Sequence, residues 1–581
     1  MSPSRLSTMS AANLKLMNYI KSSSPISNAY QENRRPKISA IELISLIFIG
    51  FSAFSLSCAL VILNPRNTAW LRWGDSAQHY LGWEFFRRSD LVQFPIGNNP
   101  SFGTGFSSSI FYSDAIPLLA LPLKYLLRPI NGDFQYLGIW ILACFILQAI
   151  FAFKIISRFV NYPLSRLLIV GFFCTAPAFI FRFSIDGFGH FALGSHFLIL
   201  WAIDTYIKSD SEKKHWFLVL CLTSFIQPYM FLIVLPIFLA SEIRSFILPS
   251  IKLRKLPFLL LHSCKIAFGI GILLFVFGGF SLGGIQGDNL RKFRATLTSL
   301  IDPGPTYATS WSGIIPDINA DSGTNEGFGF LGVGVWIVLL LVVALKILYD
   351  KFSISRNLLP LFFAALVSFF ISLSPLVSFG GFDLFEIPTG QFVYSIWSVA
   401  RSAGRFIWPP LYIIMIWAFA SICIYFRRHS LYLSLFLAAL LSFQIYDGRH
   451  AFSESRERFV HAEVLYTDLG IWDKLASGKN HLVAIPSLNN DPEWVELAFL
   501  ALRHNLTTNA ASIDRISSFE LLLFDAQKQK DLENFAFDSD TLYVVTNYPP
   551  NPFRESLLKY FEQDRSPLKM FIIDDLIVIS S

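Results

Sequence analysis

Long uninterrupted apolar blocks constrain this chain more than any other feature of its sequence. The clear blocks are about 17–25 residues long, the length that a helix needs to cross roughly 30 Å of hydrocarbon. They cover 41–63, 134–157, 163–181, 191–207, 258–280, 328–349, 357–377, 409–426 and 430–446. Only 15% of the 581 residues are charged and 53% are hydrophobic, whereas a soluble chain averages about 25% charged residues. The sequence therefore predicts a polytopic α-helical membrane protein.

Two further apolar segments leave the topology open, and loop charge decides between the alternatives. Segment 110–127 is short, and segment 216–243 is long and is broken at Gln227-Pro228-Tyr229. Suppose that 110–127 stays at the outer face and that 216–243 is a hairpin of two short helices. Every basic cluster in a short loop then lies inside, as the positive-inside rule requires. If 110–127 crossed instead, the later clusters would all lie outside.

The preferred arrangement has about eleven crossings and places the chain in the bacterial inner membrane, with its N-terminus cytoplasmic. The predicted parts are a cytoplasmic basic tail (1–39), a transmembrane domain (40–446) with outer loops 64–133, 182–190, 281–327 and 378–408, and an extracytoplasmic domain (447–581). Loops gathered on one face of a membrane domain are where function usually lies.

The C-terminal domain is predicted to be a small α/β soluble domain. Its pattern predicts strands over 481–486 and 542–546, one or two strands within 570–580, and helices over 493–504, 517–530 and 552–561. It contains no catalytic motif, which favours a capping or acceptor-docking role.

Composition also excludes several classes of function. The six cysteines all fall in apolar blocks, so neither a disulfide framework nor a CxxC metal site is readable. The net charge of +6 reflects basic cytoplasmic loops and does not indicate a nucleic-acid partner. The Gly-rich runs lack the strand–turn–helix context of a nucleotide-binding loop.

The first outer loop carries the leading catalytic candidate, Asp75. In one interpretation Asp75 is the N-cap of an amphipathic helix that lies in the membrane interface, with its aromatic residues towards the lipid. In the other, Asp75 lies beside a lipid phosphate and takes a proton from an acceptor hydroxyl. His79, one helical turn later, could share that task, bind phosphate or serve as a structural hydrogen-bonding residue.

Other charged residues at the outer face are candidates for substrate binding. Arg401 and Arg405 are four residues apart, which would place both on one helical face. Arginine suits planar recognition of phosphate, although snorkelling to headgroups is the alternative; Arg182 has a similar case. Asp114 lies in an apolar segment, where an ionisable group is costly and therefore a functional candidate; the alternative is that it faces water beside the bilayer. Glu326 could bind sugar or acceptor hydroxyls, or cap a turn.

The layout resembles the GT-C superfamily of integral-membrane glycosyltransferases. In that superfamily an acid lies early in a long outer loop, which ends in an interfacial helix before the second membrane helix. Asp75 matches the early acid, 113–119 matches the interfacial element with one proline in place of two, and 134–158 matches the second helix. A second acid often follows the third helix, and Asp186 occupies that place.

A closer resemblance is to an uncharacterised bacterial GT-C-like family of the DUF6311 type. It is carried by Gly74-Asp75, Gly189-His190, Gln227-Pro228-Tyr229 and the run 402–409. Ser76 follows Asp75 where related enzymes have a second acid, which leaves the need for a divalent metal open.

The resemblance implies a glycosyltransferase that moves a sugar from a polyprenyl-phosphate donor to an extracytoplasmic glycan, lipid or protein. The implied catalytic residues are Asp75, Asp186 and His79, and the implied substrate-binding and phosphate-binding residues are Arg401, Arg405, Arg182, His190, Asp114, Tyr229 and Glu326.

Two other classes of function compete with an enzyme. A transporter or flippase of a lipid-linked saccharide predicts ionisable groups in the middle of spans and inverted repeats. The sequence has no evident repeat, and its candidates gather at one membrane face. A non-catalytic envelope-assembly scaffold predicts that Asp75 is dispensable.

Overall fold

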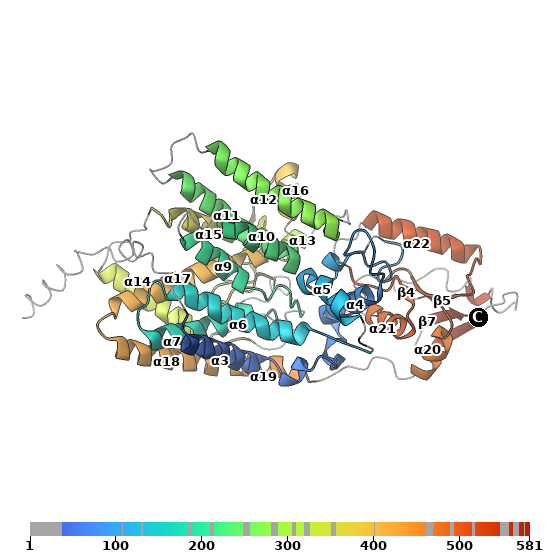
Figure 1. Ribbon diagram of the computed structural model, residues 1–581, viewed down its shortest axis with the longest axis horizontal. Helices are drawn as coiled ribbons and strands as arrows, with labels where there is room; N and C mark the ends of the chain where they lie inside the picture. Colours follow the sequence, from blue (N-terminus) through green and yellow to red (C-terminus); the bar gives the residue numbers. More distant parts are fainter. Residues whose placement is uncertain are drawn as a thin grey trace, which may run out of the picture.

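A computed structural model gives the arrangement of most of the chain (Figure 1). It describes residues 38–106, 108–128, 130, 132–183, 189–208, 214–247, 256–280, 289–304, 310–318, 326–349, 356–399, 401–460, 469–488, 493–513, 518–545, 557–559, 561, 569–573 and 576–580. All but the last two residues of the predicted N-terminal tail, 1–39, lie outside these ranges.

Apolar helices form the larger part of the molecule, and most run along its long axis (Figure 1). Among the described residues, six segments are long and apolar enough to cross a membrane, and they form α3 (Ala40–Ser57), α6 (Leu137–Ile156), α11 (Pro228–Ile247), α12 (Leu256–Phe277), α17 (Trp408–Tyr425) and α18 (Ser430–Asp447). Shorter apolar helices are α5 (Pro117–Leu127), α7 (Pro163–Cys174), α9 (Phe197–Ile207), α10 (Lys214–Ile226), α14 (Val333–Tyr349) and α15 (Leu359–Ser372). The multi-pass helical architecture agrees with the sequence, and the number of about eleven crossings stays a prediction.

Several predicted spans are divided or shortened. The block 163–181 becomes α7 and the short α8 (Pro177–Ile180), because Pro177 has no N–H to continue the helix. The block 41–63 becomes α3 and the 3₁₀ turn η1 (Leu60–Leu63). The block 191–207 is helical only from Phe197.

The segment 216–243 forms the predicted antiparallel pair, α10 and α11, with a break at Gln227. The indole Nε1 of Trp216, near the start of α10, donates to Ser241 Oγ late in α11 at 3.1 Å. A residue that precedes proline disfavours the helical region, which explains a break just before Pro228. With 20 residues, α11 is longer than the short helix expected.

Segment 110–127 forms the 3₁₀ turn η3 (Ile110–Tyr112) and the 11-residue helix α5. At 1.5 Å per residue α5 is about 16 Å long, which is too short to cross the hydrocarbon core. Lys124 of α5 bonds Ser89 Oγ at 2.8 Å, so α5 is tied to the end of α4 (Gly74–Arg88). The length of α5 favours the topology in which 110–127 does not cross.

A helix after Asp75 was predicted to lie in the membrane interface, and this prediction of its environment is wrong. Helix α4 does form, but only Gly74, Asp75 and Arg88 escape burial. The C-terminal domain covers its outward face, where the rings of Tyr80 and Phe499 stack at 5.9 Å. Helix α4 is therefore enclosed by protein.

The C-terminal domain has a mixed five-stranded sheet in the order β4-β3-β5-β7-β6. Its strands are β3 (His481–Ile485), β4 (Thr507–Thr508), β5 (Thr541–Val545), β6 (Lys569–Ile573) and β7 (Leu576–Ser580), and its helices are α20 (Leu469–Ala476), α21 (Trp494–His504) and α22 (Ser518–Glu533). Strand β3 pairs in parallel with β4 and β5, whereas β7 is antiparallel to β5 and β6. The predicted α/β character is confirmed, and most of the predicted helix 552–561 lies outside the described residues.

The predicted outer loop 378–408 contains regular elements that the sequence patterns did not predict. These are the hairpin of β1 (Leu376–Phe379) and β2 (Phe382–Glu386), the helix α16 (Gln391–Ser398) and the 3₁₀ helix η7 (Ala403–Ile407). The remaining described elements are η2 (Ala69–Leu71), α13 (Asn289–Lys292) and α19 (Arg449–Arg458).

Three backbone segments meet beside η7 because glycine occupies two of the contact points. A Cβ on Gly404 would lie 2.6 Å from the backbone nitrogen of Gly327. A Cβ on Gly327 would lie 2.4 Å from Cα of Ala295. These distances are below any tolerated contact, so the stacking fixes the neighbours of both glycines, Glu326 and Arg405.

We expect Gly404→Ala to destabilise the protein by about 1–3 kcal/mol, the usual cost of overpacking, because the clash is with backbone atoms. The measurement is thermal unfolding of the full chain in detergent. Gly271→Ala in α12 is the matched control, since nothing lies within 4 Å of its added Cβ. Equal midpoints for the two variants would contradict the close packing at Gly404.

Candidate functional site

Most of the predicted site residues gather in one place, although they come from distant parts of the chain. The group, called here the acid–arginine cluster, consists of Asp75, His79, Asp114, Arg182, His190, Tyr229, Glu326 and Arg405. Helix α4 supplies two of these residues, α11 and η7 supply one each, and the others lie in the segments that join helices.

Glu326 is the anchor of the acid–arginine cluster. Arg405 binds its carboxylate in a bidentate manner, with Nε at 2.8 Å from Oε2 and Nη2 at 2.9 Å from Oε1. Arg182 adds Nη1 at 2.7 Å from Oε2 and also donates to the Glu326 backbone carbonyl at 3.2 Å. Burial raises the pKa of Glu326, but the two guanidinium groups outweigh it and hold that pKa well below its usual value.

Aromatic rings hold the two arginines in position. The Arg182 guanidinium lies 5.0 Å from the ring of Trp408, and that of Arg405 lies 4.7 Å from the ring of Tyr229. The Tyr229 hydroxyl donates to the carbonyl of Ser402 at 2.5 Å, which fixes the ring beside η7. Cation–π contacts of this kind are strongest where water is excluded.

His190 lies among three carboxylates. Its Nε2 is 3.1 Å from Asp75 Oδ2 and 3.7 Å from Glu326 Oε1, and its Nδ1 is 3.5 Å from Asp114 Oδ2. Burial alone would lower the pKa of His190, but the neighbouring carboxylates, Asp75 first, raise it. His190 therefore links Asp75, Asp114 and Glu326.

Asp114 is held in a backbone conformation that non-glycine residues rarely adopt. Its φ is +52°, and that of Ile116 is +53°; such strain is often stored at functional sites. The Gln227 amide donates to Asp114 Oδ1. Burial raises the pKa of Asp114, but the contact with His190 and nearby positive charges outweigh it and lower the pKa to about 2.

Gln227 contacts the acid–arginine cluster, although the sequence analysis used it only as part of a helix break and of a family motif and did not predict it as a site residue. Its signal was a buried amide in an apolar segment, and an amide there needs a polar partner. Asp114 is that partner, because Gln227 donates to it.

Asp75 differs from the other two acids in its exposure. Its side chain is 30% exposed, compared with 5% for Asp114 and 6% for Glu326. It lies in the first turn of α4, whose N-cap is Trp73 and has no side-chain cap bond, so the interpretation of Asp75 as an N-cap is wrong. Loss of water around its carboxylate, caused by the surrounding protein, raises the pKa of Asp75 above the ordinary value.

His79, Asp114 and His190 form a group of possible metal ligands. One ligand atom from each lies within 4.8 Å of the others. Burial lowers the pKa of His79 to about 4, which keeps this imidazole neutral at pH 7. Two neutral imidazoles and a carboxylate suit Zn²⁺ with one position left open. The side chains therefore fit a divalent cation.

Two predicted site residues are not placed in the cluster by the described contacts. Asp186 lies outside the described residues. Arg401 is half-buried in the turn before η7. Because η7 is a 3₁₀ helix that begins at Ala403, Arg401 and Arg405 do not share an α-helical face, and that prediction is wrong.

Comparison with protein families gives two matches along the chain. Residues 47–449 match the family described as a domain of unknown function, DUF6311. Residues 471–573 match the DUF6311 C-terminal domain. Among the curated proteins none matches.

Among solved structures, the chain is similar to an archaeal oligosaccharyltransferase, AglB from Archaeoglobus fulgidus, in complex with an inhibitory peptide and a dolichol-phosphate. The identity is 11% and the TM-score 0.38, and the match covers 89% of this chain and 71% of that one. ArnT from Cupriavidus metallidurans bound to undecaprenyl phosphate is also 11% identical, with a TM-score of 0.42 over 93% of this chain and 97% of that one.

We expect Glu326→Gln to destabilise the protein by about 3–5 kcal/mol, because it leaves two buried guanidinium groups without their carboxylate. Thermal unfolding in detergent measures the change. Glu386→Gln removes the exposed partner of Arg291 and should cost less than about 1 kcal/mol. A similar, small loss in both variants would show that Glu326 does not anchor the acid–arginine cluster.

We also expect Zn²⁺ to raise the unfolding midpoint of the wild-type protein relative to a sample in EDTA, because a ligand that binds only the folded state stabilises it. Asp114→Asn should lose most of this rise, since it removes the only carboxylate ligand of the three. An equal rise in the wild type and in Asp114→Asn would place any bound Zn²⁺ elsewhere.

Proposed function

We propose that this chain, which belongs to the DUF6311 family, is a membrane glycosyltransferase that moves a sugar from a polyprenyl-phosphate donor to an acceptor hydroxyl outside the cytoplasm. The observation that carries the proposal is the state of Asp75. It is the accessible carboxylate in a cluster that also holds two buried arginines and a histidine in contact with all three acids. Activation of the acceptor hydroxyl needs a carboxylate that acts as a base, and departure of the lipid phosphate needs groups that donate hydrogen bonds to its oxygens.

Asp75 is the proposed general base. A base must reach the proton that it removes, and Asp75 alone among the three acids of the cluster keeps substantial exposure. Its raised pKa brings it closer to the operating pH, where a base is most effective. Asp75 takes the proton of the acceptor hydroxyl as the hydroxyl oxygen attacks the anomeric carbon.

Arg405 and His190 are the proposed partners of the departing lipid phosphate. Arg405 donates hydrogen bonds from Nε and Nη2 to Glu326, and its Nη1 protons remain for a phosphate oxygen. Glu326 and Tyr229 fix the guanidinium before any ligand arrives, and donors fixed in advance cost no reorganisation during reaction. The C–O bond to the lipid phosphate breaks as the new glycosidic bond forms, which inverts the anomeric centre.

A lipid-linked donor fits the position of the cluster. Tyr229 lies at the start of the apolar helix α11, and Arg405 lies in η7, directly before the apolar helix α17. A donor whose chain stays in the bilayer therefore reaches the cluster without leaving the membrane. The acceptor approaches from the extracytoplasmic side as a glycan, lipid or protein.

We expect a deletion strain to lose one glycan and to accumulate the matching polyprenyl-phosphate sugar, and the wild-type gene to reverse both changes. Asp75→Asn keeps the side-chain size but removes the base, so the transfer rate should fall by about 10²–10⁴-fold. Glycan profiling and lipid extraction measure product and donor, and the membrane level of each variant is checked.

Glu386→Gln is the matched control, because it removes an exposed outer carboxylate that lies outside the acid–arginine cluster. It should restore the glycan fully. Full restoration by Asp75→Asn at equal abundance would end the assignment of Asp75 as the base. Restoration by all variants without any change in the lipid-linked sugar would favour a scaffold.

A further inference from the structure

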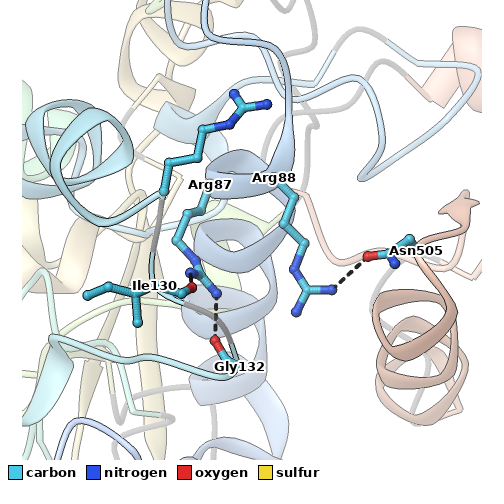
Figure 2. A pocket seen from close by; sticks show the side chains of 6 residues that line it. Arg87, Arg88, Ile130, Gly132 and Asn505 are labelled. Carbon is cyan, nitrogen blue, oxygen red and sulfur yellow. Dashed lines mark hydrogen bonds between the residues drawn. The ribbon is translucent and has the colours of Figure 1, made fainter.

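A pocket rich in arginine lies at the far end of α4, where the membrane domain meets the C-terminal domain (Figure 2). Its volume is about 420 Å³. The residues that line it are Arg87, Arg88, Arg128, Ile130, Gly132 and Asn505. This group is called the arginine pocket below.

The arginine pocket is separate from the acid–arginine cluster. Asp75 lies in the first turn of α4, whereas Arg87 and Arg88 end that helix. At 1.5 Å per residue the two ends are about 20 Å apart. A single phosphate therefore cannot occupy both places, and the arginine pocket has no part in the reaction proposed above.

Positive charge exceeds negative charge in the arginine pocket. Arg87 and Arg88 share one fully buried carboxylate, Glu84, at 2.6 Å and 3.3 Å. Asp133 is more than half exposed and lies 3.9 Å from Arg88, where solvent screens the pair. Arg128, from the end of α5, adds a third cation. The surplus charge favours an anionic ligand.

The arginines also retain hydrogen-bond donors. Each guanidinium has five N–H groups, and Arg87 uses Nη1 and Nη2 on Glu84 and on the carbonyls of Ile130 and Gly132. Its Nε is buried and has no partner among the described residues. Among the residues that the structure describes, Arg128 makes one hydrogen bond, from Nη1 to the carbonyl of Ser89 at 3.0 Å. The exposed Arg88 bonds only through Nη1 and Nη2 among the described residues, so Arg88 and Arg128 both retain donors for an oxyanion.

Exposed apolar residues follow Arg88 and precede Arg128 in the chain. Val92 is 96% exposed and Leu126 is 71% exposed. The Tyr125 hydroxyl donates to the carbonyl of Leu91 at 3.1 Å, which joins the two segments that carry these side chains. Exposed apolar residues beside arginines are the pattern by which a protein surface meets lipid chains and their headgroups together.

We propose that the arginine pocket binds a phosphate group, held by Arg87, Arg88 and Arg128. Guanidinium groups match phosphate oxygens in a planar, bidentate way. The phosphate is carried by a lipid headgroup or by a water-soluble phosphate ester, and the exposed apolar residues near Arg88 and Arg128 in the chain favour the lipid. This binding does not depend on Asp75 being a base.

The test measures binding to the full chain in detergent with three probes. Glycerol phosphate is the soluble ester, dioctanoyl phosphatidic acid is the lipid ester, and dioctanoylglycerol is the lipid without phosphate. We expect dioctanoyl phosphatidic acid to bind the wild-type protein, and Arg128→Gln to weaken that binding about tenfold, the effect of losing one charge-assisted hydrogen bond. Arg128 is exposed, so this variant should keep the wild-type unfolding midpoint.

Arg503→Gln is the matched control, because it removes an exposed arginine of α21 that is paired with Asp473 outside the arginine pocket. It should bind all probes as the wild type does. Loss of glycerol phosphate binding in Arg128→Gln would assign the soluble source, and loss confined to phosphatidic acid would assign the lipid. Unchanged binding of both esters in Arg128→Gln, or equal weakening in Arg503→Gln, would overturn the proposal.

Discussion

The charge-paired contact of Glu326 with Arg182 and Arg405 is the interaction on which the rest of the site depends. It joins three segments that are far apart in sequence and buries all three side chains. Removing three charges from water is costly unless each is paired, so this geometry persists only while all three partners are present. The arrangement is therefore better explained as positioning than as a source of stability, because apolar residues would hold the same loops together at lower cost.

Backbone geometry supports that contact from both sides. Gly327 follows Glu326, and Gly404 precedes Arg405. Because neither glycine has a Cβ, the two loops can touch. On the other side, Asp114 and Ile116 adopt positive φ, which turns the Asp114 carboxylate towards His190. Backbone strain at Asp114 is tolerated because Gln227 and His190 hold the Asp114 carboxylate. The segments that carry Glu326, Arg405 and Asp114 are thus fixed by contacts with other parts of the chain.

Features that depend on local sequence could be predicted, whereas features that depend on contacts between distant segments could not. Apolar blocks predict helices because burial in lipid is a property of the segment itself, and a break before Pro228 follows from local sterics. The environment of α4 was mispredicted because the covering surface comes from residues some 400 positions later, as the bond from Arg88 to the carbonyl of Leu502 shows. Charged residues at the outer face could be identified individually, whereas the pairing of Glu326 with two arginines depends on tertiary contacts.

Helix α4 links the C-terminal domain to the acid–arginine cluster. Its middle is held by that domain through the stacking of Tyr80 on Phe499 and the bond from Ser512 to Gln78. Its first turn carries Asp75, and its last turn carries Arg88, which donates to Leu502 and Asn505. The same helix therefore contacts the C-terminal domain along its middle and end and His190 through Asp75 in its first turn. The C-terminal domain thus helps to position the helix that carries Asp75, although the described residues of the acid–arginine cluster all come from the part of the chain before it.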